Sequence, residues 1–137
     1  MSCIFCKIID GDIPSYKIYE DQDMIAFLDI SQTTKGHTLV VPKKHTRNIY
    51  EMDEVLASTI FKKIPMIANA IKKAFNPIGL NIINNNELPL QSVDHFHIHL
   101  IPRYHDDTFD IQFQSHQNHY DNSSYLEVLN KIIHHLS

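Results

Sequence analysis

Residues 95–101 restrict the possible fold more than any other segment of this chain. Histidines alternate there with apolar residues, in the order His95, Phe96, His97, Ile98, His99, Leu100 and Ile101. Strict alternation predicts a half-buried β-strand, because successive side chains of a strand point to opposite faces. The apolar residues would face a core, and three imidazoles would stand about 6.6 Å apart on the other face. Pro102 cannot donate a backbone hydrogen bond, so we expect the strand to end there or to lie at a sheet edge.

The length and composition indicate a soluble globular protein. The chain has 137 residues, of which 43% are hydrophobic and 20% are charged, so we expect one domain over residues 1–137. The net charge of −4 argues against nucleic-acid binding, since nucleic-acid-binding proteins usually carry a basic face. No apolar run is long enough to span a membrane, and the N-terminus lacks a signal-peptide pattern. We therefore expect a cytoplasmic protein with no membrane partner.

The remaining patterns predict an antiparallel sheet covered by helices, an α+β fold. Besides the histidine segment, strands are expected at residues 16–19, 24–28, 37–42 and 80–83. Residues 104–122 are expected to be irregular.

Three helices are expected to accompany this sheet. A short one covers residues 3–9. A long one begins after Asp53 as N-cap, and its apolar stripe over residues 56–75 would form core or a dimer interface. Pro65 should kink or divide the long helix. A capping box at Ser124 and Glu127 predicts a C-terminal helix.

The histidine segment allows three chemical interpretations. It could be a solvated strand face that happens to use histidine. It could be a catalytic metal site, because two histidines at i and i+2 with a third ligand can hold Zn²⁺ and leave a position open. It could also perform phosphoryl chemistry, in which one neutral imidazole attacks phosphorus and its neighbours hydrogen-bond to the phosphate oxygens. An imidazole can do this near neutral pH without a helper base.

Cys3 and Cys6 form a C-x-x-C pair and are the only cysteines. In a reducing compartment such a pair indicates a metal half-site or a redox pair rather than a structural disulfide. Two unpaired buried thiols are the alternative, because the pattern alone is weak.

The sequence resembles the histidine triad (HIT) superfamily of nucleotide hydrolases and transferases, in its bacterial Hit/Hint-like branch. The resemblance is carried by the motif Gln91-Ser92-Val93-x-His95-x-His97-x-His99 and by matching blocks at residues 3–15, 26–31, 36–45 and 79–85. These blocks occur in order over roughly the first hundred residues.

The resemblance implies a catalytic role for four residues. His97 would be the nucleophile that forms a covalent nucleotidyl-histidine intermediate, which water then resolves. His99 would bind and polarise the phosphate, and His37 would complete the cluster. Ser92 would donate to the phosphate or to the leaving group. The third strand histidine stands where the transferase branch has glutamine, so hydrolysis is favoured over transfer.

The implied reaction is hydrolysis at the α-phosphorus of a purine nucleotide derivative, of the phosphoramidate type because of Ser92. Cleavage of dinucleoside polyphosphates is the alternative within the same family. A nucleotide-binding or regulatory module with incidental turnover is the alternative from another class. A metal hydrolase that uses the strand histidines is a third.

The resemblance also implies a nucleotide-binding set. Asp29 would accept hydrogen bonds from ribose hydroxyls, and apolar residues would clamp the base, although core packing is nearly as good an explanation for each of them. The residues concerned are Ile4, Phe5, Ile8, Phe27 and Ile30 for the base, and Gln91 and Val93 near the phosphate.

The loop at residues 84–90 departs from the family pattern. The active-site asparagine of the family is Asn85 when counted forward from Gly79 and Asn84 when counted back from Gln91, and we favour Asn85. The loop also lacks the usual glycines, with Leu90 before Gln91. A side chain at position 90 restricts the backbone there, which weighs against a backbone contact to phosphate.

Related proteins that hold structural zinc suggest how the cysteine pair could be completed. His45 and His95 would join Cys3 and Cys6 around a tetrahedral Zn²⁺. The resemblance further suggests a homodimer.

Overall fold

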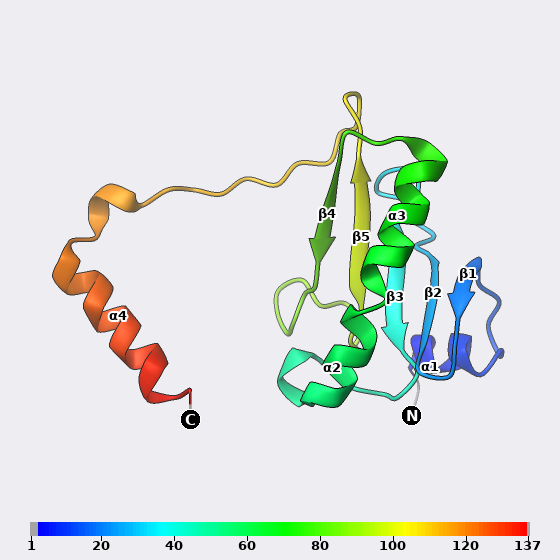
Figure 1. Cartoon of the computed structure of the whole chain (residues 1–137), viewed down its shortest axis with the longest axis horizontal. Coiled ribbons are helices and arrows are strands. Elements are labelled where there is room, and N and C mark those ends of the chain that lie inside the picture. Colours follow the sequence, from blue (N-terminus) through cyan, green and yellow to red (C-terminus); the bar gives the residue numbers. More distant parts are fainter. Residues whose placement is uncertain (1–2, 137) are drawn as a thin grey trace.

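The computed structural model describes residues 3–136 and shows a five-stranded antiparallel sheet. The strands lie in the order β1-β2-β3-β5-β4 (Figure 1). Their bounds are Lys17–Glu20 for β1, Met24–Leu28 for β2, Thr38–Pro42 for β3, Gly79–Ile83 for β4 and Ile98–Arg103 for β5. The helices are α1 Ile4–Ile9, α2 Glu54–Phe61, α3 Ile64–Phe75 and α4 Asn122–His134, with short 3-10 turns at Ile49–Glu51 and Gln117–His119. The predicted α+β class is confirmed.

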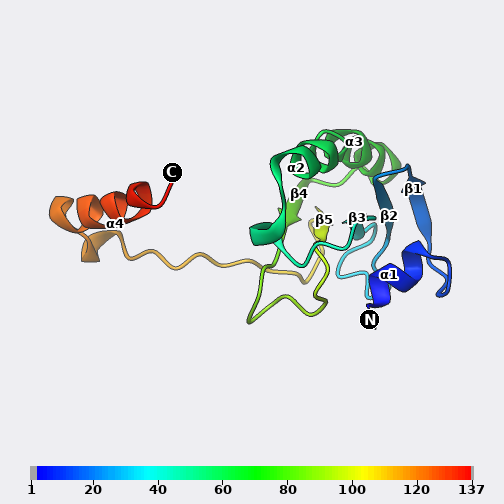
Figure 2. The same cartoon turned by 90° about the horizontal axis from the view of Figure 1, so that it is seen from below.

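Helices lie on both faces of the sheet. Helices α2 and α3 lie against one face, and α1 lies on the other face beside β1 and β2 (Figure 2). Because side chains alternate along a strand, each face of the sheet has its own apolar residues. Met24, Ala26 and Val40 face α2 and α3, whereas Phe27 and Leu39 face α1. Burying one set on each face gives the sheet two cores.

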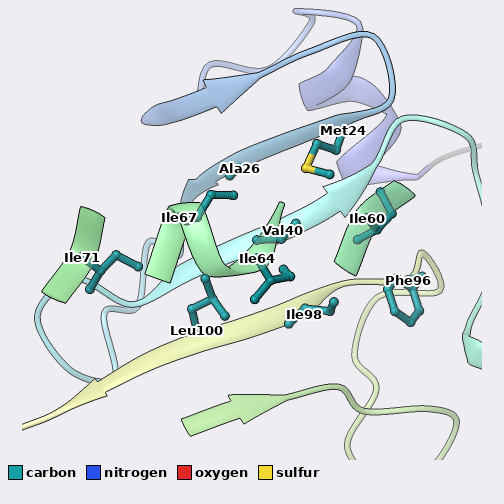
Figure 3. Close-up of a cluster of buried hydrophobic side chains, with 10 residues drawn as sticks. All are labelled: Met24, Ala26, Val40, Ile60, Ile64, Ile67, Ile71, Phe96, Ile98 and Leu100. Atoms are coloured by element: carbon teal, nitrogen blue, oxygen red, sulfur yellow. The ribbon is translucent and has the colours of Figure 1, made fainter. Parts of the chain in front are cut away.

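The larger core lies between the sheet and α2 and α3 (Figure 3). Its ten buried side chains are Met24, Ala26, Val40, Ile60, Ile64, Ile67, Ile71, Phe96, Ile98 and Leu100. Ile60, Ile64, Ile67 and Ile71 belong to the predicted apolar stripe, which therefore contributes to the core.

The predicted long helix is divided in two. Asp53 caps α2, and its carboxylate accepts a hydrogen bond from the amide of Leu56 at 2.8 Å. Pro65 lies in the first turn of α3, where its missing N–H costs no helical hydrogen bond. The expected effect of Pro65 is confirmed.

The histidine strand begins later and ends later than its pattern predicts. Residues 95–97 precede β5, because the amide of Phe96 donates to the carbonyl of Thr46 rather than to a neighbouring strand. Pro102 is the last but one residue of β5, so the expected end of the strand is wrong by one residue. β5 is an inner strand of the sheet, but at Pro102 itself the expected edge position holds. The pairing of β3 stops at Leu100, and Pro102 therefore faces β4 alone.

The C-terminal helix is present, but it does not cover the sheet. A long extended segment carries α4 away from the body of the protein (Figure 1). Its N-cap is Asp121, which accepts from the amide of Ser124, so the predicted cap at Ser124 is wrong by three residues. Within residues 3–136, no helix combines the length and apolarity needed to cross a membrane.

Candidate active site

His97 is held with one ring nitrogen bonded and the other free. Its Nδ1 lies 2.7 Å from the carbonyl oxygen of His95. A carbonyl oxygen only accepts hydrogen bonds, so Nδ1 carries the proton and Nε2 keeps a free lone pair. The side chain is buried, and burial lowers the pKa of His97 against the opposing effect of the bond to His95. A neutral imidazole with a free nitrogen is the form that a nucleophile needs.

A chain of hydrogen bonds fixes the protons of His37 and His99. The backbone N–H of Thr33 donates to Nδ1 of His37 at 3.2 Å, so His37 holds its proton on Nε2. That nitrogen lies 2.9 Å from Nδ1 of His99, which accepts the bond, and His99 therefore carries its own proton on Nε2. His99 offers an N–H donor to a ligand where His97 offers a lone pair.

Burial keeps the cluster uncharged. It lowers the pKa of His37, although the nearby carboxylate of Asp29 raises it. Burial also lowers the pKa of His99, and the neighbouring rings of His97 and His37 lower it further, to about 4. At neutral pH the three imidazoles are neutral.

Asp29 directly follows β2 and approaches His37. Its Oδ1 accepts from the amide of Ser31 at 2.8 Å and from the Ser31 hydroxyl at 2.6 Å, and its Oδ2 lies 3.6 Å from Nε2 of His37. Burial raises the pKa of Asp29, but the Ser31 hydrogen bonds and the nearby His37 and His99 lower it to a net value below the ordinary one. Asp29 is therefore an ionised carboxylate with acceptor sites for hydroxyl groups.

A cavity of about 310 Å³ opens beside His97, and most of the predicted nucleotide-binding residues line it. Phe5 packs edge-on against His97, with ring centroids 5.0 Å apart, so α1 forms one wall next to the nucleophile. The predicted residues that line this cavity are Ile4, Phe5, Ile8, Phe27, Asp29, Ile30, Ser92, Val93, His97 and His99. An apolar wall with a few polar groups at one end suits a nucleoside with its phosphate.

Six further lining residues were not predicted, namely Ile13, Pro14, Ser15, Tyr16, Leu28 and Leu39. Leu39 pairs with Phe27 in β2 and with His99 in β5, so all three side chains emerge on the same face. Strand pairing was the missing signal, because a single sequence does not show which strands are neighbours. Pro14 and Tyr16 line the cavity from the segment after α1, where the pattern predicted a helix end and the start of a strand but no binding role.

A second cavity, of about 780 Å³, adjoins the first at His99 and lies on the β4 side. His37 and Asn85 line it, together with side chains of β4 and β5. Asn84 points elsewhere, because its Nδ2 donates to the carbonyl oxygen of His97 at 2.9 Å. The two candidate asparagines thus differ: Asn85 borders a cavity and Asn84 holds the backbone of His97.

Gln91 orders the loop that carries Ser92. Its Oε1 accepts from the amide of Glu87 at 2.7 Å, and its Nε2 donates to the carbonyls of Arg47 at 2.7 Å and Val93 at 3.0 Å. The buried Gln91 amide is thereby used within the protein, and its contact with a nucleotide stays a prediction. Glu87 has a φ of 61°, a conformation that favours glycine, in this glycine-free loop.

Cys3, Cys6, His45 and His95 converge with ligand atoms that all lie within 4.8 Å of one another. Nδ1 of His95 lies 3.5 Å and 3.6 Å from the two sulfurs, and Nδ1 of His45 lies 3.3 Å from Cys6 Sγ. Ligand bonds of about 2.3 Å to sulfur and about 2.05 Å to nitrogen place tetrahedral neighbours about 3.6 Å apart. Nε2 of His95 lies 2.8 Å from the carbonyl of Pro42, which leaves Nδ1 unprotonated for a metal. The four residues fit Zn²⁺.

A second group, Asp29, His37 and His99, also has ligand atoms within 4.8 Å of one another. It does not fit a metal, because the Thr33 amide occupies Nδ1 of His37 and keeps a proton on Nε2. His37 and His99 are therefore arranged for hydrogen bonding rather than for metal coordination.

Comparison with known sequences gives one family. The HIT domain model matches residues 10–106. Protein hit of Bacillus subtilis is 62% identical over 104 residues, which cover 75% of this chain and 72% of that protein. Adenosine 5'-monophosphoramidase hnt1 of Schizosaccharomyces pombe is 43% identical over 104 residues, or 75% of each chain.

Comparison with solved structures gives the same family. The crystal structure of a HIT family member from Bacillus subtilis is similar with a TM-score of 0.97 and 50% identity, over 100% of this chain and 99% of that chain. A HIT family protein from Bacillus anthracis gives 0.95 and 51%, over 99% and 98%. A Zn-bound histidine triad family protein from Mycobacterium smegmatis gives 0.75 and 32%, over 96% and 98%.

Proposed function

This chain belongs to the HIT family, and we propose that it hydrolyses purine nucleotide derivatives at the α-phosphorus through a nucleotidyl-histidine intermediate. The observation that carries the proposal is the hydrogen bond from Nδ1 of His97 to the carbonyl of His95, which leaves Nε2 free beside the cavity. The base would lie against Phe5 and Phe27, and the ribose hydroxyls would donate to Asp29.

In the first step Nε2 of His97 attacks the α-phosphorus, and the bond from phosphorus to the leaving group breaks. His97 becomes positively charged, and the carbonyl of His95 stabilises that charge through the Nδ1–H bond. The Nε2–H of His99 donates to a phosphate oxygen, a bond that strengthens as charge develops there. Ser92 is exposed on the same cavity and would donate to the phosphate or to the departing group.

In the second step water attacks the phosphorus, and the bond to Nε2 breaks with its electron pair returning to His97. The proton that water loses replaces the one that the departing amine took up. The products are a nucleoside monophosphate and the neutral His97, ready for a further turnover. His37 keeps His99 in the tautomer that donates, and so acts on the phosphate indirectly.

The substrate class that we propose is an adenosine phosphoramidate, in which an amine leaves. Support comes from the 43% identical relative named as an adenosine 5'-monophosphoramidase. A 39% identical relative from Arabidopsis thaliana is named as an adenylylsulfatase, and its match spans 52% of that longer protein. Both names place the reaction on an adenylyl group and differ in the leaving group.

Turnover of adenosine phosphoramidate and of a diadenosine polyphosphate by the same preparation tests the proposal. We expect cleavage of the former, a loss of about 10³-fold or more in kcat for His97→Ala, and an adenylylated His97 peptide in quenched reactions by mass spectrometry. Preferred cleavage of the polyphosphate would indicate the alternative hydrolase. AMP binding by calorimetry without turnover would indicate a binding or regulatory module.

We further propose that Cys3, Cys6, His45 and His95 hold a structural Zn²⁺, which would tie α1 to the segment before β5. The fit of the donor atoms supports this, as does the Zn-bound family structure. The metal would supply folding energy rather than chemistry, because four protein ligands close a tetrahedral site and leave no open position for a substrate. We also propose a cytoplasmic protein of one domain, for which the family resemblance suggests a homodimer.

A further inference from the structure

Residues 29–37 connect β2 to β3, and this loop carries a site residue at each of its ends. Asp29 directly follows β2, and His37 directly precedes β3. The amide of Asp29 donates to the carbonyl of His37 at 3.0 Å, so the two ends lie opposite each other as a further pair of strand residues would. Whatever holds the shape of this loop therefore holds both the carboxylate and the imidazole of the site.

The side chain of Gln32 joins the two ends of the loop and uses both atoms of its amide. Its Nε2 donates to the carbonyl of Asp29 at 2.7 Å and to the carbonyl of His37 at 2.8 Å. Its Oε1 accepts from the amide of Gly36 at 2.9 Å. A carbonyl oxygen only accepts and a backbone N–H only donates, so these three partners determine the orientation of the Gln32 amide.

The backbone of Gln32 adopts a conformation that its side-chain contacts stabilise. Its φ is 43°, in the left-handed region that a residue with a side chain rarely adopts. Such a conformation persists only where the surrounding contacts hold it. The next peptide unit carries the N–H of Thr33, which donates to Nδ1 of His37 at 3.2 Å. Relaxation of Gln32 to a negative φ would turn that peptide unit and withdraw the donor from His37.

We propose that Gln32 is a positioning residue, which fixes the proton of His99 by holding the Thr33 amide in place. Without that amide, either nitrogen of His37 can carry the proton, and the 2.9 Å bond from His37 to His99 can run in either direction. His99 would then spend part of its time with a lone pair on Nε2, which repels a phosphate oxygen. The effect on the rate rests on the proposed function, whereas the effect on the tautomers does not.

Other contacts hold the outer part of the loop, so loss of the Gln32 amide should leave the fold intact. The buried hydroxyl of Thr34 donates to the carbonyl of Pro102 in β5. The hydroxyl of Tyr104 donates to the carbonyl of Lys35 at 2.6 Å. These bonds tie the loop to the end of β5 and to the segment that follows it, and neither of them involves Gln32.

Three variants of the full-length protein test the proposal. Gln32→Leu removes the amide, keeps a side chain of similar size and leaves the left-handed backbone as unfavourable as before. Gln32→Glu keeps an acceptor for the Gly36 amide but cannot donate to either carbonyl at neutral pH. Lys35→Ala is the control, because it changes the net charge by the same amount as Gln32→Glu, in the same loop, and leaves the contacts of Gln32 in place.

Side-chain ¹⁵N NMR of the protein without ligand measures the tautomers independently of turnover. In wild type and in Lys35→Ala we expect His99 to be protonated on Nε2. In both Gln32 variants the signals of the two His99 nitrogens should move toward each other, as in a mixture of tautomers. His97 should stay protonated on Nδ1, since its partner is the carbonyl of its own segment.

Steady-state kinetics with adenosine phosphoramidate measures the consequence for catalysis. A cluster that holds the donating tautomer for about a tenth of the time should lose about tenfold in kcat, and we expect this loss in both Gln32 variants. KM should change little, because the carboxylate of Asp29 keeps its bonds to Ser31. Lys35→Ala should match wild type in both constants.

The outcomes separate this proposal from the proposed function. Unchanged His99 tautomers in both Gln32 variants would overturn it, as would loss of the native amide spectrum in both, since Gln32 would then support the fold instead. If the tautomers shift but wild type shows no turnover, the positioning of His99 is supported and the proposed hydrolysis fails. If wild type is active and both Gln32 variants keep its kcat, the positioning role fails and the proposed hydrolysis stands.

Discussion

Nε2 of His37 lies 2.9 Å from Nδ1 of His99, although 62 positions separate the two residues in the chain. The contact joins the segment before β3 to β5. On the far side of the His37 ring the Thr33 amide donates to Nδ1, so the hydrogen bond between the two rings runs from His37 to His99. Because the backbone N–H can only donate, the proton of His37 is fixed on Nε2, and the proton of His99 is also fixed on Nε2. The cluster is therefore ordered for one chemical role at each ring.

This order predicts the tautomers of the three histidines in solution. We expect His97 to be protonated on Nδ1, and His37 and His99 on Nε2, at pH 7.5. Two-dimensional ¹⁵N NMR of the side chains distinguishes the two nitrogens of each ring. In His37→Asn the donor to His99 changes, and the His99 signals should shift while those of His97 stay. A His97 ring protonated on Nε2 would contradict the proposed nucleophile.

The order of the cluster could be predicted from sequence only in part. The alternating pattern correctly placed Phe96, Ile98 and Leu100 in the core, because the side to which a residue points depends only on its neighbours in the sequence. The bonds from Thr33 to His37 and from His37 to His99 depend on strand pairing, which a single sequence does not display. Likewise, the pattern could not show that Pro102 stays inside β5, because that depends on where β3 stops pairing.

The position of helix α4 could not be predicted from the sequence either. The capping box at Ser124 and Glu127 predicted a C-terminal helix, and the helix is there, although it begins earlier. Periodicity says only that one side must be covered, not by which surface. The expectation that helices cover the sheet therefore holds for α1, α2 and α3 and fails for α4.

The lowered pKa of His99 predicts a loss of stability in mild acid. The folded pKa is about 4, and the unfolded one is about 6.5. Between these values the unfolded chain binds a proton that the folded chain does not, so the free energy of unfolding falls as pH falls below about 6.5. From pH 7.5 to pH 5, His99 should account for about 1–2 kcal/mol, allowing for its partial exposure.

Urea unfolding at the two pH values measures this loss. His99→Gln should lose less stability than wild type over the interval, whereas His116→Gln, in the exposed segment before α4, should match wild type. An equal loss in His99→Gln and wild type would show that His99 is not the group responsible.

Zinc removal should affect stability before activity. We expect about one equivalent of zinc in protein purified without added metal, and none in Cys3→Ser. Chelation should lower Tm while the initial rate below the new Tm is unchanged, because a zinc ion closed off by four protein ligands has no open position for a substrate. Metal analysis, thermal unfolding and initial rates check this, with His105→Ala as the control. Loss of the rate at once on chelation would support the metal-hydrolase alternative.

Truncation of the core at α3 should be costly. Ile67 is buried among the strands and α2, so Ile67→Ala should lower the free energy of unfolding by about 2–5 kcal/mol. The adjacent Met66 is half exposed on the other side of the same helix, and Met66→Ala should cost under about 1 kcal/mol. Chemical denaturation of both variants makes the comparison. A similar cost for the two would mean that α3 is rotated relative to the sheet.

The two candidate asparagines should give different kinetic defects. Asn84 donates to the carbonyl of His97 at 2.9 Å, so Asn84→Ala frees the backbone at the nucleophile and should lower kcat about tenfold with little change in KM. Asn85 borders the cavity shared with His99, so Asn85→Ala should raise KM for substrates with a large leaving group and spare a simple phosphoramidate. Steady-state kinetics with both substrates separates the effects. If Asn85→Ala lowers kcat for both substrates and Asn84→Ala does not, Asn85 contacts the reacting phosphate and Asn84 is dispensable for catalysis.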